Sequence, residues 1–83
     1  MYEVEFIEEA RVDYNDLDGS QQLLIDKSLK RIQERGMQAG AALRGSLAGC
    51  RKMVHKKAGL RVIFRESRNR IELIYIIAVD IIY

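Results

Sequence analysis

The stretch Ile71–Val79, with the sequence IELIYIIAV, is interrupted by only one charged residue, Glu72. A strand with apolar side chains on both faces has to be covered on both sides, which is typical of a central strand in a sheet. Two stretches before it also predict strands, giving Arg51–His55, Leu60–Arg65 and Ile71–Val79, with turns at Lys56–Gly59 and Ser67–Arg70. We therefore expect an antiparallel meander in the second half of the chain.

The first half of the chain predicts one strand and a helical hairpin. Acidic and apolar residues alternate over Tyr2–Ile7, the period-two pattern of a half-buried strand, and Glu8–Leu17 then has helical spacing. Asp18 and Gln21 have the spacing of a capping box that starts a second helix, and Gly36 lies where we expect a left-handed C-terminal cap. The inward stripe of this second helix is Leu24, Ile25, Ser28, Leu29 and Ile32.

These elements together predict one α+β domain over residues 1–83, in the order β-α-α-β-β-β, with the helices on one face of the sheet. Residues 37–49 are rich in Gly and Ala and have neither a strand pattern nor a bulky apolar stripe, so we expect a loop with at most a turn of helix. A chain this short buries only about 60% of its unfolded surface, which favours a partner that completes the core.

The composition excludes several classes of protein. With 48% hydrophobic and 31% charged residues the chain is globular, and no stretch reaches the roughly 20 apolar residues of a membrane span. The first residues lack the basic start and apolar run of a secretory signal. A single cysteine, Cys50, forms neither an intramolecular disulfide nor a zinc site, and we expect it to be a small half-buried filler. We therefore expect a soluble cytoplasmic protein without membrane contact.

Charge is strongly segregated along the chain, although the net charge is only +2. Residues 1–26 hold eight acids and one base, residues 27–70 hold thirteen bases and two acids, and residues 71–83 hold two acids. Basic surfaces attract phosphate backbones through counterion release, so the middle segment favours RNA as a partner. For four of its bases the pattern instead favours a solvated helix face: Lys27, Lys30, Arg31 and Arg35.

The turn at Lys56–Gly59 also predicts how the strands on either side of it pair. The opposite pairs are Val54 with Arg61, Lys52 with Ile63, and Cys50 with Arg65. Because directly paired residues share a face, Lys52, Arg61 and Arg65 project together, and the other face meets the helices through Met53, Leu60, Val62 and Phe64. Converging cations are what phosphodiester cleavage without a metal requires, since negative charge builds on the phosphate oxygens. The alternative is an exposed sheet face that simply needs polar residues.

Other candidate catalytic groups have less support. His55 titrates near neutral pH, but in this register it lies on the helix side at a strand end, which favours a turn-edge residue over a general base. Tyr2, Tyr14 and Tyr75 fit core positions. The chain has no Gly-rich phosphate loop, no nucleophile elbow and no paired carboxylates, which excludes those enzyme classes. We expect no cofactor and no metal.

Two stretches resemble the RelE/ParE toxin superfamily: LRGSLAGCRK at residues 43–52 and KKAGLRVIFR at residues 56–65. The resemblance covers nearly the whole chain and is strongest over Leu43–Val79. There the superfamily shows a segment with Leu and Gly leading into the strands, then a basic strand, an Arg-Val-Ile-aromatic strand and a hydrophobic strand. The β-α-α-β-β-β order agrees with it. The resemblance implies the toxin of a type II toxin–antitoxin module.

The two branches of the superfamily imply different targets. RelE-branch members are ribosome-dependent mRNA endonucleases, and the resemblance places their basic catalytic positions on Lys52 and Arg61, with Lys56 as a phosphate contact. The cleavage product would be a 2′,3′-cyclic phosphate, and Lys52 acts as the base only where neighbouring cations depress its pKa. Further RNA contacts are expected from Lys57, Arg65 and Arg51. ParE-branch members instead poison gyrase, so a non-catalytic gyrase inhibitor is the alternative.

Two departures from the RelE pattern bear on activity. A second lysine that many RelE-like members carry two residues after the first is Val54 here, and their Gly-Lys-Arg and late tyrosine give way to Asp80–Tyr83. The arginine and tyrosine which that motif usually supplies to catalysis are missing. The chain is then a truncated toxin, a weakened toxin acting as an antitoxin-binding module, or a toxin in which these residues are dispensable.

The resemblance also implies a cognate antitoxin, acidic and RelB-like, with a partly disordered segment that wraps the toxin. An acidic amphipathic helix over Lys52, Arg61 and Arg65 would remove these side chains from RNA, and charge complementarity would speed its arrival. The apolar chain end at residues 81–83 leaves exposed surface, so we expect a complex, or a homodimer through the last strand, rather than a monomer.

Overall fold

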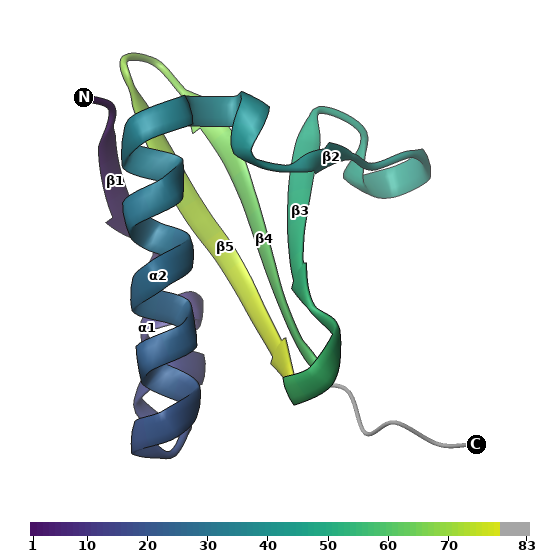
Figure 1. Cartoon of the computed structure of the whole chain (residues 1–83). Coiled ribbons are helices and arrows are strands. Elements are labelled where there is room, and N and C mark those ends of the chain that lie inside the picture. The colour runs from purple at the N-terminus through teal and green to yellow at the C-terminus, as the bar shows by residue number, and fades with distance from the viewer. Residues whose placement is uncertain (79–83) are drawn as a thin grey trace.

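The structure, a computed structural model, describes residues 1–78 and forms a five-stranded sheet with two helices packed on one face (Figure 1). The elements are β1 (Glu3–Phe6), α1 (Glu8–Asn15), α2 (Gly19–Arg35), β2 (Ala41–Ala42), β3 (Cys50–His55), β4 (Leu60–Ser67) and β5 (Arg70–Ala78). The strand order in the sheet is β1-β5-β4-β3-β2. The predicted α+β class and the antiparallel meander of β3, β4 and β5 are confirmed, but the sheet is mixed because β1 runs parallel to β5.

The helical hairpin begins and ends much as its sequence predicts. The Gln21 backbone N–H donates to Asp18 Oδ1 at 2.8 Å and the Asp18 N–H donates to Gln21 Oε1 at 2.9 Å, which confirms the capping box. Gly36 has the expected positive φ of 64°, but its ψ of −141° lies outside the left-handed helical region. A Cβ at this position would lie 2.7 Å from Tyr2 Cζ, so any larger residue would displace the Tyr2 ring.

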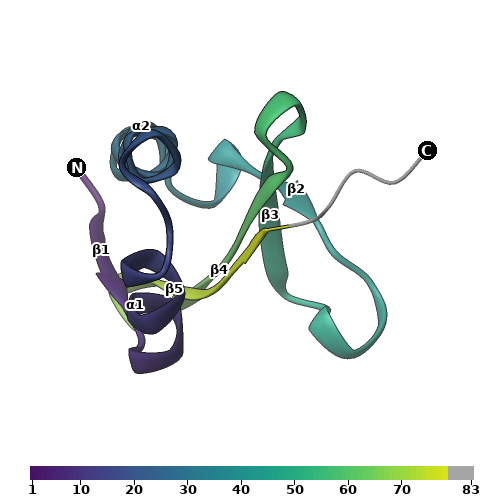
Figure 2. The ribbon, with the colours of Figure 1, turned by 90° about the horizontal axis from the view of Figure 1, so that it is seen from below.

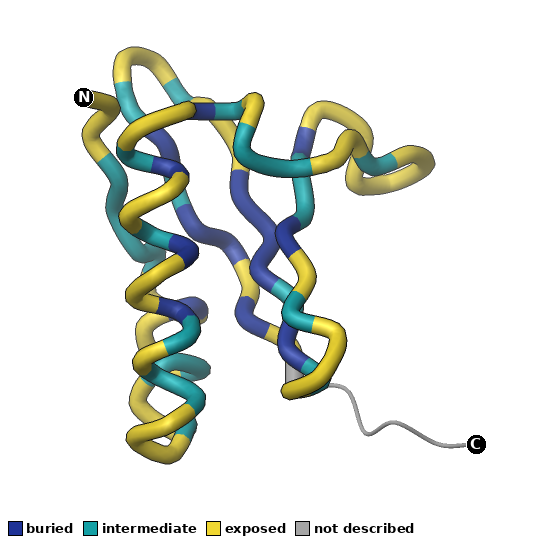
Figure 3. Tube along the Cα trace, in the orientation of Figure 1, coloured by how far each residue is buried: buried dark blue, intermediate teal, exposed yellow. Residues whose placement is uncertain are grey.

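The main hydrophobic core lies between the helices and the sheet. Figure 3 shows buried residues concentrated in β4, in β5 and along one side of α2. The buried members of this cluster are Ala10, Ile25, Ile32, Met53, Leu60, Val62, Phe64, Ile71, Leu73 and Ile76. A smaller cluster of Cys50, Ile63 and Ile74 has Leu43 packed against it. Cys50 is 9% exposed, so it is more deeply buried than the expected half-buried filler.

A bulge in β5 changes which of the side chains after it face the helices and which face the other side of the sheet. Ile63 pairs with Tyr75 and Phe64 pairs with Leu73, which leaves Ile74 as an extra residue. Because one extra residue shifts the alternation, Ile76 rather than Tyr75 joins the main core. The predicted core position of Tyr75 was therefore wrong, and its side chain is 38% exposed.

The other two tyrosines differ from each other. Tyr2 precedes β1 and is 48% exposed over Gly36, so its predicted core position was also wrong. Tyr14 is half-buried, packs against the main core and donates a 2.8 Å hydrogen bond from its hydroxyl to Asp26 Oδ1. This hydrogen bond raises the pKa of Tyr14 above its ordinary value. Burial and the negative charge of Asp26 raise it further.

The segment at residues 37–49 contains more regular structure than its sequence predicts. It forms two 3₁₀ turns, as a turn of helix allowed, and also the two-residue strand β2, which pairs with β3. Figure 2 shows the loop between β2 and β3, which contains the second of these turns, on the side of the sheet away from α2.

Among the described residues, no helix combines the length and the apolar character needed to cross a bilayer. The expected contact through residues 81–83 lies outside the described part of the chain.

Candidate nucleic-acid interface

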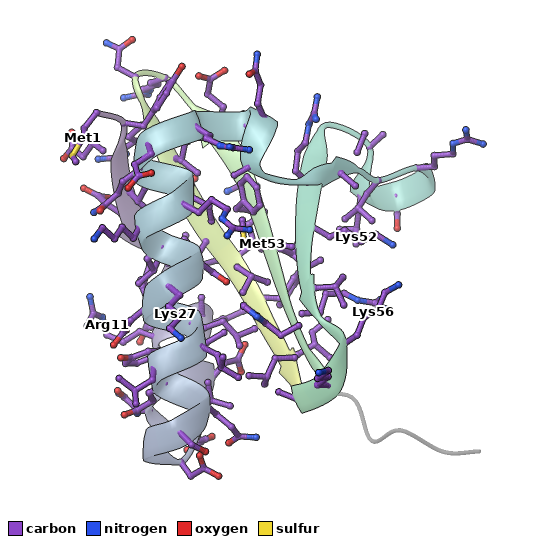
Figure 4. All side chains as sticks on the ribbon, in the orientation of Figure 1. Met1, Arg11, Lys27, Lys52, Met53 and Lys56 are labelled. Atoms are coloured by element: carbon purple, nitrogen blue, oxygen red, sulfur yellow. The ribbon has the colours of Figure 1, made fainter. Side chains whose placement is uncertain are left out.

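The β3–β4 hairpin pairs in the register that the sequence predicts. Val54 lies opposite Arg61, Lys52 opposite Ile63, and Cys50 opposite Arg65. Lys52 and Met53 point to opposite sides of β3 (Figure 4), with Met53 in the main core beneath the helices. We call the side of the sheet away from α2 the open face, and its side chains from β3, β4 and β5 include Lys52, Val54, Arg61, Arg65, Glu72, Tyr75 and Ile77.

Lys52 occupies the centre of the predicted cationic group. Arg61 and Arg65 are both its diagonal neighbours across the β3–β4 ladder, with Cα atoms roughly 7–8 Å away. Arg61 and Arg65 are four residues apart on one strand, hence roughly 13 Å from each other. Lys52 is therefore close enough to either arginine for the two side chains to contact one phosphate group.

Arg61 is half-buried between two exposed apolar residues. Val54 and Ile77, its direct neighbours across β3 and β5, are 39% and 40% exposed. The Nε atom of Arg61 is buried and has no hydrogen-bond partner among residues 1–78. A buried donor without an acceptor costs about 1–3 kcal/mol. Arg61 is thus held on the open face with hydrogen-bonding capacity that the described residues do not use.

Arg65 differs from Arg61 because an acid neutralises it. Its Nε donates to Glu72 Oε1 at 3.2 Å, and the two side chains are 49% and 15% exposed. The predicted cationic group of Lys52, Arg61 and Arg65 therefore contains one arginine that is already paired. The sequence feature that could have indicated this ion pair is Glu72, the one charged residue in the otherwise apolar stretch Ile71–Val79.

The remaining predicted RNA contacts lie apart from Lys52 and Arg61. Arg51 lies on the opposite side of β3, opposite Phe64, and its Nη1 donates to the Gly40 carbonyl at 3.0 Å. Lys56 and Lys57 are exposed in the 3₁₀ turn Lys56–Ala58 at the end of the hairpin. The structure therefore brings together Lys52 and Arg61, and leaves Arg51 on the other face.

His55 lies on the helix side of the sheet, as the predicted register requires. Its Nε2 is 2.5 Å from Ser28 Oγ on α2. Burial lowers the pKa of His55 below 6.5, and the positive charges of Arg31 and Lys27 lower it further. Because the sheet separates it from Arg61, His55 is not part of the candidate interface on the open face.

Three apolar side chains of the open face were not recognised in the sequence as part of a site. Val54, Tyr75 and Ile77 are all exposed around Arg61 and Ile63. The bulge at Ile74 turns Tyr75 and Ile77 to this face, and no sequence pattern marks that bulge.

Among the described residues, no group of three or more His, Cys, Asp or Glu side chains could hold a metal ion.

Several solved structures share this fold. The isolated RelE toxin of E. coli superposes with a TM-score of 0.83 at 20% identity, over 96% of this chain and 86% of that one. A chain of the RelBE2 toxin–antitoxin complex of Mycobacterium tuberculosis gives a TM-score of 0.80 at 19% identity, over 93% and 90% of the two chains. A chain of the chromosomal ParDE system of P. aeruginosa gives 0.70 at 17% identity, over 96% and 98%.

These likenesses confirm the fold that the sequence resemblance implied. No protein-family profile matches the chain, and no curated protein matches it in sequence. The similarity is therefore visible in the arrangement of strands and helices, across nearly the whole of each matched chain.

Proposed function

We propose that this chain, which has the fold of the RelE and ParE toxins, is the toxin of a toxin–antitoxin module and cleaves mRNA on the ribosome. One observation carries the proposal. Arg61 is half-buried on the open face beside Lys52, with a buried Nε that has no partner among the described residues. A guanidinium held in this way favours a phosphodiester, whose oxygens gain negative charge as it is cleaved.

In the proposed reaction the ribose 2′-oxygen attacks the adjacent phosphorus and the bond from phosphorus to the 5′-oxygen breaks. The products are a 2′,3′-cyclic phosphate and a 5′-hydroxyl. Arg61 and Lys52 offset the charge on the non-bridging oxygens and hold the phosphate in line. The proton leaves the 2′-hydroxyl for a base, which Lys52 provides only in its neutral form. The departing 5′-oxygen takes a proton from solvent water.

Primer extension on mRNA that is being translated tests this activity. Purified protein should produce new stops within codons, and Lys52→Ala and Arg61→Ala should each remove most of them. Lys30→Gln, an exposed substitution on α2 with the same change of charge, serves as the matched control and should leave the stops unchanged. The absence of new cleavage sites with the parent protein would overturn the nuclease proposal.

The exposed apolar residues of the open face favour a second candidate function. Val54, Tyr75 and Ile77 surround Arg61 with apolar surface, which suits a protein partner better than a nucleic-acid backbone. A non-catalytic inhibitor of gyrase fits this surface and the likeness to a ParDE chain. In a DNA supercoiling assay, inhibition of gyrase at stoichiometric protein, together with no mRNA cleavage, would favour this second function.

The same face also suits the antitoxin that we propose as partner. An acidic amphipathic helix would place apolar side chains on Val54 and Ile77 and a carboxylate on Arg61. Light scattering at low and high salt, with and without the product of the neighbouring gene, should show a stable complex that Arg61→Glu weakens. A monodisperse monomer that ignores the acidic partner would contradict this part of the proposal.

A further inference from the structure

A second polar site lies on the other side of the sheet, between α2 and the end of β3. A groove of about 240 Å³ opens there, and its polar lining consists of Lys27, Ser28 and Arg31 from α2 and His55 from β3. Met53 contributes to the apolar floor; Figure 4 labels it together with Lys27. Since one water takes up about 30 Å³ in the liquid, this α2–β3 groove has room for an anion of several heavy atoms.

The base of the α2–β3 groove is a fixed pair of side chains. Ser28 is only 1% exposed, and its Oγ lies 2.5 Å from His55 Nε2. This hydrogen bond joins α2 to β3 and sets the orientation of the imidazole ring. When His55 is doubly protonated, Nε2 donates to Ser28 and the Nδ1–H is left for another acceptor.

The rim of the groove is positively charged without a compensating acid. Lys27 and Arg31 are four residues apart on α2 and therefore neighbours on one side of the helix. Within residues 1–78, neither side chain forms an ion pair. An adjoining pocket is lined by His55 and by Lys56 and Lys57 from the 3₁₀ turn after β3. No acid lines this pocket or the α2–β3 groove.

Burial lowers the pKa of His55, and the positive charges of Arg31 and Lys27, which line the same groove, lower it further. An arrangement of this kind is unfavourable when empty, since like charges repel each other across a partly buried space. An anion between them would offset this repulsion and lower the positive potential at the imidazole. Lys27 and Arg31, which the sequence pattern assigned to a solvated helix face, are then half of a binding site.

We propose that the α2–β3 groove binds a phosphate group, with Lys27 and Arg31 as its charged partners and protonated His55 as a hydrogen-bond donor. The site is independent of the proposed nuclease centre, because the sheet lies between His55 and Arg61. The phosphate group belongs either to a small phosphate-bearing molecule or to an RNA backbone. Both sources present the same oxygens to the same three side chains.

His55 is the only histidine in the chain, so its imidazole C2 proton gives one unambiguous NMR signal. Inorganic phosphate, titrated at constant ionic strength, should shift this signal saturably and raise the pKa of His55. The Lys27→Gln/Arg31→Gln double variant should bind phosphate at least roughly tenfold more weakly, since it removes both charged partners of the anion. Lys30→Gln, exposed on α2 but outside the groove, should respond like the parent.

The same signal separates the two sources of phosphate and the two proposed sites. A short single-stranded RNA without terminal phosphates shifts His55 if the groove holds a backbone, and leaves it unshifted if the groove holds a free phosphate ion. Arg61→Ala should remove most mRNA cleavage yet keep the phosphate response. A His55 signal that responds alike to phosphate and to chloride, or a loss of response as large in Lys30→Gln as in the double variant, would overturn the proposed groove site.

Discussion

Asp13 Oδ2 accepts a 3.1 Å hydrogen bond from the backbone N–H of Ile76, which lies 63 residues later in the chain. β1 pairs with β5 only as far as Leu73, so this edge of β5 has no neighbouring strand beyond that point among the described residues. α1 lies beside that edge, and its carboxylate supplies an acceptor that a strand would otherwise provide. The contact fixes the helix to β5 just after the bulge that points Tyr75 to the open face.

Asp13→Ala should lower the free energy of unfolding by about 1–3 kcal/mol, because the Ile76 N–H is then left without its acceptor in a half-buried place. Asp16→Ala is the matched control, with the same change of charge at an exposed residue whose side chain makes no hydrogen bond in the described part of the chain. Urea unfolding of both variants measures the difference. Equal stability of the two would show that the edge contact contributes nothing.

Gly40→Ala should destabilise the protein by roughly 1–3 kcal/mol through overpacking. A Cβ at Gly40 would lie 2.6 Å from the Lys52 carbonyl oxygen and 2.7 Å from Phe64 Cζ, so β3 or the 37–42 segment has to move. Gly19→Ala is the control, because Gly19 begins α2 with nothing within 4 Å of the added Cβ, and alanine there should be neutral or stabilising by up to about 1 kcal/mol. The urea midpoint should therefore fall for Gly40→Ala and stay level or rise for Gly19→Ala, and a Gly40→Ala protein as stable as the parent would rule out the clash.

The pairing of β3 with β4 could be predicted from the sequence because a turn and two alternating strands determine it locally. Once the turn was placed at Lys56–Gly59, each pair from His55–Leu60 to Cys50–Arg65 followed by counting. The capping box at Asp18 and Gln21 was predictable for the same reason, since its partners are three residues apart.

Features that depend on distant parts of the chain could not be predicted in this way. The parallel pairing of β1 with β5 joins residues near opposite ends of the described chain. The bulge at Ile74 leaves no mark in a stretch that is apolar at nearly every position, and yet it decides the side to which Tyr75 points. The pairing of Arg65 with Glu72 likewise follows from the β4–β5 register, which the bulge at Ile74 shifts partway along the strand.

Glu72→Gln should strengthen the binding of RNA to the open face, because it frees Arg65 from its ion pair. Single-stranded RNA, followed by fluorescence anisotropy at several salt concentrations, should gain affinity and a slope steeper by about 0.7 for one added phosphate contact. Stability should change by less than about 1 kcal/mol, since the Arg65 side chain is half exposed. Arg65→Gln is the opposite control and should leave the salt slope unchanged or lower. A slope unaffected by Glu72→Gln would remove Arg65 from the interface.

Acidification should destabilise the fold through His55. Burial, Arg31 and Lys27 hold the pKa of His55 below 6.5, so the unfolded chain takes up this proton at a higher pH than the folded one. Well above pH 6.5 both states are neutral at this residue. As the pH falls through 6.5 the unfolded state binds more protons than the folded one, and the free energy of unfolding declines until the folded pKa is passed.

His55→Gln lacks this proton uptake, so the parent should lose more stability than the variant between ~pH 7.5 and ~pH 5.5. Urea unfolding in buffers without phosphate measures both pH profiles, and the carboxylates, which titrate lower, affect the two proteins alike. Parallel profiles would mean that the histidine titrates in the folded protein as it does in the unfolded chain. Added phosphate should reduce the loss in the parent alone, since an anion between Lys27 and Arg31 favours the protonated imidazole that acid produces.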